Sequence, residues 1–460
     1  GYYFMKNVIF WVGVKNNHYA EKYGGWEWMD ISRKTWEYWC EKHDVIFFPF
    51  EKPIDEDLVK YRINWQKSIY CFDLLDEAGI DYDQIFLVDA SCMAKWDMPN
   101  VFELTDHKFT AWRETDNLNW VYDSVKGYED FFSYKLDIQK YFSSGVIIFN
   151  KSHRDIFLEF KDLYLNNVDE FVELQDKIVH KGTEQTPLNY WLQKNEVEMN
   201  LDLPFTYKLT HIHRKEMFGN NWQLKEDDTP YFIKYGKNWV FNGISKNQRT
   251  NTMKQVWDIV KHNYVKNQTI DLLLDSINED KHTNLHTTSN KFKSDVWNFF
   301  KDFKDKICIE FGTHKGQTTK ILSYCFKHVY TINRSLESFA TAKFLNVGIE
   351  NIIYVPFDLY SQEELDVEKS NVFMIDAGHK YPEVIYDIDR CIRMSADGDS
   401  YIIFDDYGLN THEENVKKAV DESIDKNKIE IVKKIGHQKG HEFAHKFLKE
   451  SEGLICRIVK

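Results

Sequence analysis

The sequence predicts two α/β domains in succession. Its 460 residues exceed what one hydrophobic core usually holds, and 43% of them are hydrophobic. Segments typical of strands and of helices alternate on both sides of residues 265–290. Because that stretch is polar, lacks Phe, Trp and Tyr, and is rich in Asn, Thr, Ser and Asp, we expect it to be a linker between domains at residues 1–264 and 291–460.

The first domain is expected to be a layered α/β structure. Its apolar segments predict strands at residues 7–14 and 45–50, a strand ending at Asp89, and a strand at residues 141–150. Helices are expected between residues 57 and 78 and after His153. Such alternation is typical of helices packed on a sheet around one core.

The second domain shows a more regular alternation. Helices are expected to begin near residues 318, 336, 382 and 413. The segments between and after them predict strands at residues 306–310, 328–333, 351–355, 371–376, 400–406, 429–434 and 453–460. This order predicts a doubly wound sheet with two terminal strands.

Charge and composition exclude several classes of function. The chain has 59 Lys and Arg against 73 Asp and Glu, a formal net charge of −14, so it should repel nucleic acid. No apolar run approaches the ~18 residues of a membrane span, and the N-terminus lacks the features of a signal peptide. Its seven cysteines contain no CxxC pair, which favours a reducing compartment. We expect a cytoplasmic protein, in the host cytoplasm if the gene is viral.

Glycines and polar side chains fall where the predicted strands of the second domain end. The loop after the first strand carries Glu310, Gly312, Thr313, Gly316 and Thr318. The ends of the following strands carry Asn333, Asp358, Asp376 and the pair Asp405 and Asp406. Since ligands bind at the carboxyl ends of strands in open parallel sheets, we expect these residues to line one crevice. For the two glycines alone, an ordinary turn is the alternative.

With these residues the second domain resembles the class I S-adenosylmethionine-dependent methyltransferases, a Rossmann-like fold, and in particular the macrocin O-methyltransferase-like enzymes. The resemblance covers about residues 295–460. It implies that the loop binds the methionine part of S-adenosylmethionine through Glu310, Gly312, Thr313, Gly316 and Thr318. It also implies a ribose contact at Asn333, where the family has an acid, and an adenine contact at Asp358.

Three carboxylates from two adjacent strand ends, Asp376, Asp405 and Asp406, are suitable oxygen ligands for Mg²⁺. A cation bound there would lower the pKa of a sugar hydroxyl and orient it toward the methyl group. The stretch from Asp376 to Tyr381 is similar to the family's Asp-Gly-x-His-x-Tyr segment, so we expect Asp376 and His379 to be catalytic, with His379 as general base. A capping or packing role for His379 is the alternative.

In the first domain, Asp89 follows an apolar strand, where a carboxylate could bind a cation that bridges a diphosphate. An ordinary turn after the strand is the alternative. The order of four motifs resembles that of the GT-A fold glycosyltransferases of the glycogenin-like kind, over most of residues 5–264. Those motifs are Asp89-Ala-Ser91, Tyr141-Phe-Ser-Ser-Gly145, Glu184-Gln185-Thr-Pro-Leu188-Asn189 and Val240-Phe-Asn242-Gly243-Ile-Ser-Lys246.

This resemblance implies a GT-A type α/β/α domain that binds a nucleotide-sugar donor and a glycan acceptor. It implies donor contacts at Asp89, Ser91, Arg113, Gly145 and Lys246, a metal ligand at Asp89, and Glu184 or Gln185 at the anomeric carbon. Ser91 and Val240 replace two of the three usual metal ligands. Mn²⁺ or Mg²⁺ would then be bound weakly, bound by other groups or absent, with Arg113 and Lys246 neutralising phosphates. The two candidate substitute ligands are His211 and His213, for which packing is the favoured alternative.

Together these features predict a bifunctional enzyme that transfers a sugar from a nucleotide donor and O-methylates a sugar. One alternative is an active methyltransferase whose degenerate first domain only binds the glycan substrate. Another is that the second domain binds a dinucleotide for redox chemistry, which would favour an acid at position 333 rather than Asn333. The sequence leaves open the sugar, the acceptor, the linkage and the oligomeric state.

Overall fold

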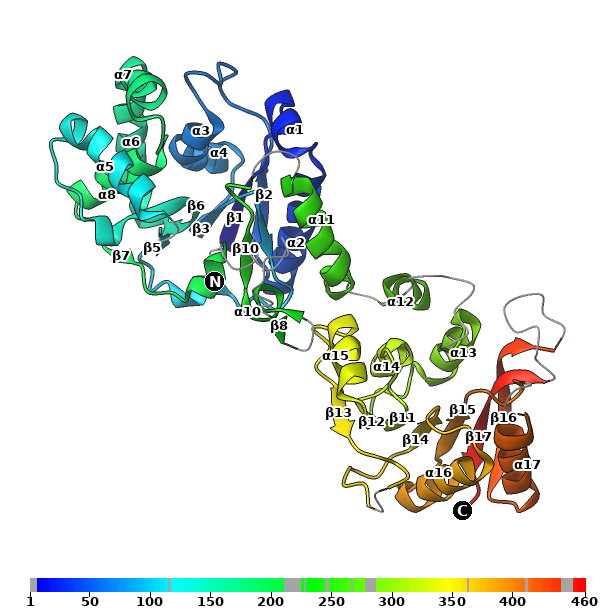
Figure 1. Cartoon of the computed structure of the whole chain (residues 1–460). Coiled ribbons are helices and arrows are strands. Elements are labelled where there is room, and N and C mark those ends of the chain that lie inside the picture. The colour runs from blue at the N-terminus through cyan, green and yellow to red at the C-terminus, as the bar shows by residue number, and fades with distance from the viewer. Residues whose placement is uncertain are drawn as a thin grey trace. The chain divides into compact units, whose positions relative to one another are not determined.

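A computed structural model of the chain describes residues 6–114, 117–210, 225–226, 229–244, 248–265, 268–277, 287–361, 364–409, 413–439 and 450–460. The chain divides into two compact units, Gly1–Leu224 with Pro230–Tyr264 and Lys225–Thr229 with Val265–Lys460. Each unit contains its own mixed α/β sheet (Figure 1), which confirms the predicted fold class. None of the described helices is long and apolar enough to cross a membrane.

The sheet of the first unit has the strand order β2-β1-β3-β6-β5-β7. Its strands are β1 (Lys6–Val12), β2 (Ile46–Phe50), β3 (Tyr82–Asp89), β5 (Phe109–Arg113), β6 (Phe142–Asn150) and β7 (Met199–Asn200). Strand β1 pairs in parallel with β2 and β3, whereas β6 runs antiparallel to both β3 and β5. A separate two-stranded sheet of this unit joins β4 (Cys92–Ala94) to β10 (Asn238–Val240). Strands β8 (Lys225–Glu226) and β9 (Thr229–Pro230) form another, at the sequence boundary between the units. This arrangement places the end of β3, and so Asp89, beside β6.

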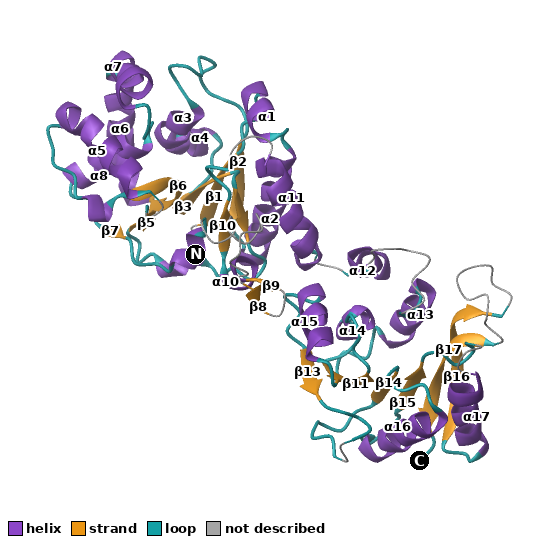
Figure 2. Ribbon diagram, in the orientation of Figure 1, coloured by secondary structure: helices purple, strands orange, loops and turns teal. Residues whose placement is uncertain are grey.

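Helices cover both faces of this sheet (Figure 2). They are α1 (Asn17–Tyr23), α2 (Glu27–His43), α3 (Ile63–Ile69), α4 (Cys71–Glu77), α5 (Leu118–Phe132), α6 (Arg154–Asn166), α7 (Val168–Glu173), α8 (Gln185–Lys194), α10 (Tyr231–Tyr235) and α11 (Gln248–Val260). The helix expected from residue 57 starts only at Ile63. The reason is that the Asp57 carboxylate accepts the backbone N–H groups of Val59 and Lys60, and this local turn competes with helix.

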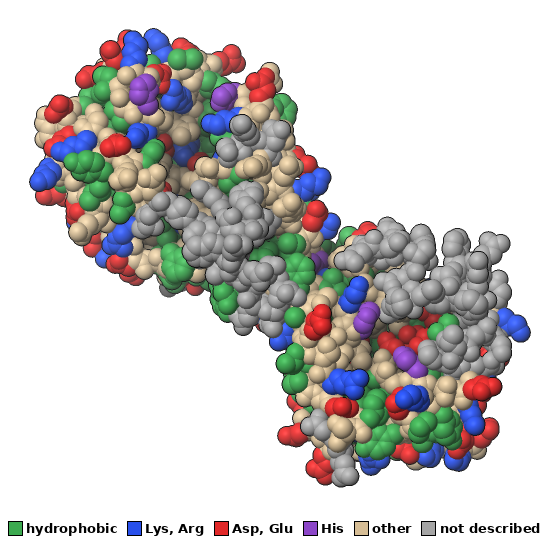
Figure 3. Space-filling view, in the orientation of Figure 1, with side chains coloured by type: hydrophobic (Ala, Val, Ile, Leu, Met, Phe, Trp, Pro, Cys, Tyr) green, Lys and Arg blue, Asp and Glu red, His purple; other side chains and the backbone are tan. Residues whose placement is uncertain are grey.

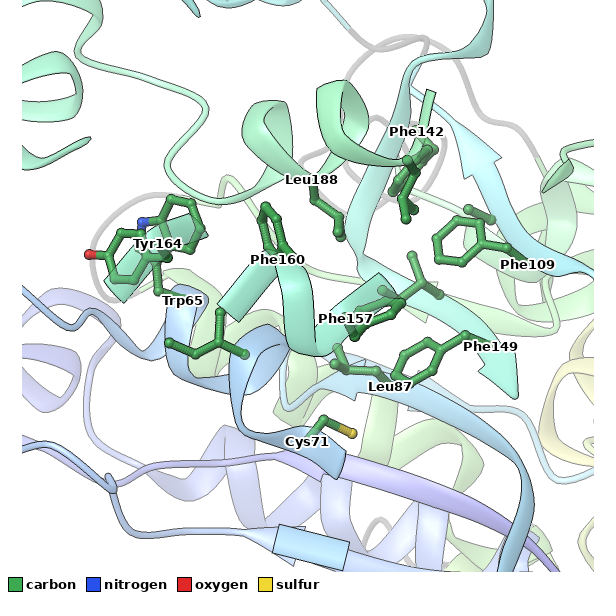
Figure 4. Close-up of a cluster of buried hydrophobic side chains, with 14 of the residues drawn as sticks. Trp65, Cys71, Leu87, Phe109, Phe142, Phe149, Phe157, Phe160, Tyr164 and Leu188 are labelled. Atoms are coloured by element: carbon green, nitrogen blue, oxygen red, sulfur yellow. The ribbon is translucent and has the colours of Figure 1, made fainter. Parts of the chain in front are cut away.

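The position of α3 is fixed by an aromatic core. Trp65 stacks on Tyr164 with ring centroids 3.8 Å apart and on Phe160 at 5.5 Å (Figure 4). Its indole N–H also donates to the side chain of Gln175 at 2.9 Å. Because Trp65 is fully buried against α6, the helix cannot rotate, and the direction of Lys67, two residues later, is fixed with it.

The sheet of the second unit has the strand order β13-β12-β11-β14-β15-β17-β16. Its strands are β11 (Ile307–Phe311), β12 (His328–Asn333), β13 (Ile352–Pro356), β14 (Val372–Ile375), β15 (Tyr401–Phe404), β16 (Ile429–Gln438) and β17 (Ser451–Ile458). All pairs are parallel except those of β17, which runs antiparallel to β15 and β16. This is the predicted doubly wound sheet with two added strands.

Helices pack on both faces of this sheet (Figure 2). They are α12 (Ile270–Ile277), α13 (Asn290–Phe300), α14 (Gln317–Ser323), α15 (Leu336–Leu345), α16 (Tyr381–Met394) and α17 (Lys418–Asp425). Alternate strand residues serve opposite faces, since Ile309 and Phe311 pack in one core with α16 and α17, while Cys308 packs in another with α13 and α14. The continuous apolar strands of the sequence reflect this burial on both faces.

The stretch expected to be a linker contains a helix. Leu273 and Ile277 of α12 are buried against Ile321 of α14, so part of residues 265–290 belongs to the core of the second unit. Polar residues flank a short apolar segment, IDLLLDSI, on both sides. The spacing of its apolar residues suits a helix with one buried face.

A buried lysine of α14 provides a stability prediction. Lys320 is fully buried, its ammonium donates to the Leu345 carbonyl at 3.1 Å, and burial lowers its pKa to about 7. We expect Lys320→Met to raise the free energy of unfolding by ~2 kcal/mol at pH 7, because it removes a group that is costly to desolvate. At pH values between about 7 and the ordinary lysine pKa of 10.5, Lys320 is protonated in the unfolded chain but not in the folded one. The wild type therefore becomes more stable as pH rises, and the stability gained by Lys320→Met becomes smaller.

Urea unfolding at pH 7 and pH 9.5 tests this expectation. The exposed Lys327 supplies the control, because Lys327→Met should change stability little at either pH. A loss of stability in Lys320→Met, or a gain that is equal at the two pH values, would contradict the explanation.

Candidate functional site

The strand ends of the second unit form one continuous edge. Backbone hydrogen bonds of 2.9–3.3 Å continue past the paired strands: Gly312 N to Ile332 O, Phe357 N to Asn333 O, Asp376 N to Phe311 O and Asp405 N to Ile375 O. Since each bond joins the end of one strand to its neighbour, the polar residues predicted to gather at the ends of β11, β12, β14 and β15 lie side by side.

Gly312 is essential to this edge. Its φ of +99° is unfavourable for other residues, and a Cβ there would lie 2.1 Å from the carbonyl oxygen of Asp376. Gly316, with φ +76°, begins α14, and a Cβ there would lie 2.6 Å from the side chain of Ala342. Both glycines are therefore required for the loop to lie closely against its neighbours.

The predicted site residues of this edge fall into two groups. Those that remain partly exposed are Gly312, Asn333, Asp358, Asp376, His379 and Asp406. Those that are buried beneath them are Glu310, Thr313, Gly316, Thr318 and Asp405. Only the first group is partly open to solvent, so the second group can support the edge only from beneath.

Glu310 illustrates the buried group. It is 1% exposed, and its carboxylate accepts the hydroxyls of Thr319 at 2.6 Å and Thr331 at 2.7 Å. Burial raises the pKa of Glu310 to about 7, although both hydroxyls oppose this. Thr313 in turn shares a 2.7 Å hydrogen bond with Thr331. Glu310 thus ties α14 to β12, and Thr313 ties the loop after β11 to the same strand.

At the next two strand ends, Asn333 and Asp358 shape the turns that follow. The Asn333 side-chain oxygen accepts the backbone N–H of Ser335 at 2.9 Å, and an Asp358 oxygen accepts that of Tyr360 at 3.1 Å. That hydrogen bond is the main reason why the pKa of Asp358 lies below its ordinary value. Both side chains stay partly exposed at the edge.

A three-residue group that could hold a metal ion lies at the ends of β14 and β15. Asp376, His379 and Asp406 each offer one ligand atom, and these atoms lie within 4.8 Å of one another. His379 Nδ1 is 3.3 Å from an Asp406 oxygen. In the space-filling view, acidic side chains and a histidine gather in a hollow of this unit (Figure 3). This group contains His379 where the expected metal ligands Asp376, Asp405 and Asp406 include Asp405.

Asp405 is absent from the group because successive residues at a strand end point to opposite sides. It is 8% exposed, whereas Asp406 adopts φ +57°, which turns its side chain toward Asp376 and His379. The sequence shows the Asp-Asp pair, but it does not show which of the two carboxylates faces outward.

The carboxyl groups of this cluster repel one another. Burial raises the pKa of Asp376 well above its ordinary value, and repulsion from Asp406 and Glu310 raises it further. Asp405 is affected in the same way, by burial and then by Asp406 and Asp376. A divalent cation would relieve this repulsion, because it adds positive charge where carboxylates crowd.

Two residues that were not predicted from the sequence, Lys293 and Glu452, interact electrostatically with the cluster. Lys293 of α13 is 2% exposed; burial lowers its pKa to about 8, although the charges of Asp405, Glu452 and Asp376 oppose this. Glu452 of β17 accepts hydrogen bonds from the backbone N–H and hydroxyl of Ser289 and from the backbone N–H of His437, at 2.6–2.9 Å. Both are distant in sequence from the strand ends, so no local pattern reveals them.

The first unit has a pocket of about 400 Å³ at the end of β3. Its lining includes Asn64, Lys67, Asp89, Glu114, Ser144, Gly145, Glu184, Gln185, Asn242 and Gly243. Asp89, Gly145, Glu184 and Gln185 were expected in the site. The structure brings these four together from β3, β6 and the start of α8.

Lys67, which no local sequence pattern reveals, also lines this pocket. Its ammonium lies 2.9 and 3.0 Å from the two oxygens of Asp89 and 3.6 Å from Glu184. Burial lowers the pKa of Lys67, but Asp89 and Glu184 more than offset this and raise it above its ordinary value. The pKa of Glu184, which is 1% exposed, is raised by burial and opposed by Lys67. Lys67 therefore stays charged.

Gly145 and Gln185 shape the pocket walls. A Cβ at position 145 would lie 2.8 Å from an oxygen of Asp89, so the glycine lets the carboxylate approach β6. The Gln185 side-chain oxygen accepts the backbone N–H of Ser144 at 3.0 Å, and its amide donates to the Tyr141 hydroxyl at 3.2 Å. Gln185 thus ties α8 to β6 beside Glu184.

Ser91 and Arg113 are not among the residues that line this pocket. Ser91 is buried behind it, and its carbonyl accepts the backbone N–H of Phe241. The Arg113 guanidinium donates to the carbonyls of Leu201 at 2.6 Å and Gln139 at 3.0 Å. The structure therefore brings neither predicted donor contact to the site. Three further candidates, Lys246, His211 and His213, lie outside the described residues.

No protein-family model matches this chain, and no curated protein matches it. Among solved structures, the chain is similar to a glycosyltransferase involved in the glycosylation of the major capsid of PBCV-1, at 11% identity and a TM-score of 0.35 over 54% of this chain and 99% of that one. It is also similar to a putative O-methyltransferase from Klebsiella pneumoniae, at 14% identity and a TM-score of 0.30 over 45% and 99%.

A third similar structure is a putative methyltransferase from Streptococcus mutans in complex with SAH, at 12% identity and a TM-score of 0.27 over 35% of this chain and 94% of that one. These likenesses are distant and concern the fold of the transferases alone. We therefore base the function on the geometry of the two sites.

Proposed function

We propose that this chain is a bifunctional glycan-modifying enzyme, which transfers a sugar from a nucleotide-sugar donor and O-methylates a sugar with S-adenosylmethionine. The observation that carries the proposal is the continuous edge of the second unit. There a glycine loop, two ligand-accessible polar strand ends and the Asp376, His379 and Asp406 group lie together. In doubly wound sheets this edge is where cofactors bind.

The residues of this edge fit S-adenosylmethionine. The backbone at Gly312 would hold the methionine part, because this glycine lets the partly exposed loop lie directly against the end of β14. Asn333 would contact the ribose and Asp358 the adenine, since both side chains are partly exposed at successive strand ends. When bound, S-adenosylmethionine supplies the methyl group on a sulfonium sulfur, which keeps the electron pair of the broken bond.

Asp376 and Asp406 fit a divalent cation such as Mg²⁺, which would lower the pKa of the acceptor hydroxyl. His379 is the general base of the proposal. Asp406 lies 3.3 Å from its Nδ1 and would orient the ring, leaving Nε2 to take the proton of the sugar hydroxyl as its oxygen gains the methyl group. Asp376 and Asp406 would also bring that hydroxyl close to the methyl donor.

In the first unit, the pocket would bind the nucleotide sugar. Transfer breaks the bond between the anomeric carbon and the phosphate oxygen, which keeps the electron pair, and forms a bond to an acceptor oxygen. Glu184 would take the acceptor proton, and its charge would stabilise positive charge at the anomeric carbon. Gly145 leaves room beside Asp89 for the sugar.

Isothermal calorimetry tests the proposal. We expect the full chain to bind S-adenosylhomocysteine and at least one of a panel of nucleotide sugars, and not to bind nicotinamide dinucleotides. Gly312→Ala should lower the affinity for S-adenosylhomocysteine at least ~10-fold, because the added Cβ would meet the Asp376 carbonyl. The affinity for the nucleotide sugar should not change. Gly398→Ala is the matched control, since Gly398 also has positive φ but no atom within 4 Å of its Cβ position.

Binding of neither ligand would defeat the proposal. Binding of S-adenosylhomocysteine and of a glycan, with no nucleotide sugar bound, would instead favour the alternative of a methyltransferase whose first domain only presents substrate. The specific observation in favour of that alternative is Ser91, which lies outside the pocket where a second acidic ligand is expected.

A further inference from the structure

Each carboxylate that lines the described part of the first-unit pocket faces a lysine. Asp89 holds Lys67 at 2.9 and 3.0 Å, and Glu184 lies 3.6 Å from the same ammonium. The third, Glu114, accepts a hydrogen bond from the nearly buried Lys208 at 3.3 Å. Each of these carboxylates therefore already has an ammonium within 4 Å, although Glu184 Oε1 accepts no hydrogen bond, and a divalent cation would have to compete with these lysines.

The residues that the structure describes in this site do not fit the divalent metal that the GT-A resemblance implies. Ser91 and Val240 replace two expected ligands, and Ser91 does not line the pocket. Over the described residues, the sole group of three metal-binding side chains is Asp376, His379 and Asp406 in the other unit. A metal ion on Asp89 would also lie next to the fixed charge of Lys67, and two cations at that distance repel strongly in a buried site.

A second buried cation balances the site. Arg249 of α11 is 6% exposed, lies 3.7 Å above the ring of Tyr23, and donates to the carbonyl of Phe241 at 3.1 Å. Burial lowers the pKa of Arg249, and the nearby Tyr23 and Asp89 oppose this. Lys67 and Arg249 thus offset Asp89 and Glu184. The second unit differs, because its carboxylates outnumber Lys293.

We infer that Lys67 takes the place of a divalent metal in the first-unit site, so that sugar transfer needs no metal while methyl transfer does. The inference rests on the proposed function for the identity of the reaction. A lysine ammonium has three hydrogens, and Asp89 engages two of them, which leaves one for an oxygen of the donor diphosphate. The metal dependence of the two activities of one chain should therefore differ.

Manganese titration of the full chain, by calorimetry after removal of metals with EDTA, tests the inference without depending on activity. We expect the wild-type chain to bind one Mn²⁺ and the Asp406→Asn chain to bind none. The Asp406→Asn chain should still bind a nucleotide sugar in EDTA, with an affinity within twofold of that in Mn²⁺. The inference would be overturned if the Asp406→Asn chain still bound Mn²⁺ and a further Asp89→Asn change abolished that binding.

Two variants of Lys67 in the Asp406→Asn background sharpen the test. Lys67→Met frees Asp89 and Glu184, so this chain should gain one Mn²⁺, whereas Lys67→Arg keeps the charge and should gain none. A gain in both variants would overturn the inference. If Lys67→Met does not fold, the Asp406→Asn result decides alone. If no nucleotide sugar binds any form, the proposed function fails, while the manganese count still tests the role of Lys67.

Discussion

The Asp376→Asn chain is expected to methylate a saccharide acceptor about a thousandfold more slowly than the wild type. Asp376 belongs to the three-residue group that could hold a cation, and it lies at the end of β14, next to the glycine loop. A metal-assisted stabilisation of the reacting oxygen is worth several kcal/mol, which corresponds to about three orders of magnitude in rate. The measurement is transfer of a labelled methyl group from S-adenosylmethionine at saturating Mg²⁺.

The same change should leave the fold intact. Asp376 is repelled by Asp406 and Glu310, so a neutral amide of equal size removes repulsion rather than a stabilising contact. We therefore expect an unchanged or higher melting temperature and an affinity for S-adenosylhomocysteine within threefold of wild type. Asp397→Asn, at an exposed turn, is the control and should change none of these. A wild-type methylation rate in the Asp376→Asn chain would show that Asp376 takes no part in the reaction.

Glu184→Gln is expected to slow sugar transfer by ~10²- to 10⁴-fold, the range for loss of a proton acceptor or of a charge at the reacting carbon. Glu184 is almost fully buried, lines the pocket, and lies 3.6 Å from Lys67. The amide keeps the shape and loses the negative charge. Release of free nucleotide from a donor that binds in calorimetry, with and without a glycan acceptor, gives the rate.

Donor affinity should change much less than the rate in Glu184→Gln, since the proposed role lies in the transition state. Glu198→Gln supplies the control, because Glu198 is exposed and pairs only at the surface with Lys108. If Glu184→Gln transfers sugar at the wild-type rate, Glu184 is not the proton acceptor, and the first unit would have to use another residue.

Most of the fold could be predicted from the sequence. Buried parallel strands are continuous apolar runs, so β11 to β15 are evident, and turn residues mark where they end. The start of α3 and the presence of α12 were not predicted, because local and distant interactions compete. Asp57 delays the start of α3 through its own turn, and α12 is a short helix whose stability comes from packing on Ile321.

The candidate site was partly predictable for the same reason. Gly312, Asp376 and His379 follow strand ends, and parallel strand ends meet at one edge, so sequence position alone places them together. Lys67 and Lys293 come from helices, and Glu452 from the reversed strand β17, so their contacts depend on the tertiary packing. The choice between Asp405 and Asp406 depends on the left-handed backbone of Asp406, which no sequence pattern reveals.

The most direct measurement of the central claim is a crystal structure of the full chain grown with S-adenosylhomocysteine. We predict ligand density along the carboxyl ends of β11, β12 and β13, with the amino-acid part at Gly312, the ribose at Asn333 and the adenine at Asp358. The sulfur should point toward Asp376 and His379. Ligand density elsewhere on the chain, or none at saturating concentration, would contradict the proposed chemistry of the second unit.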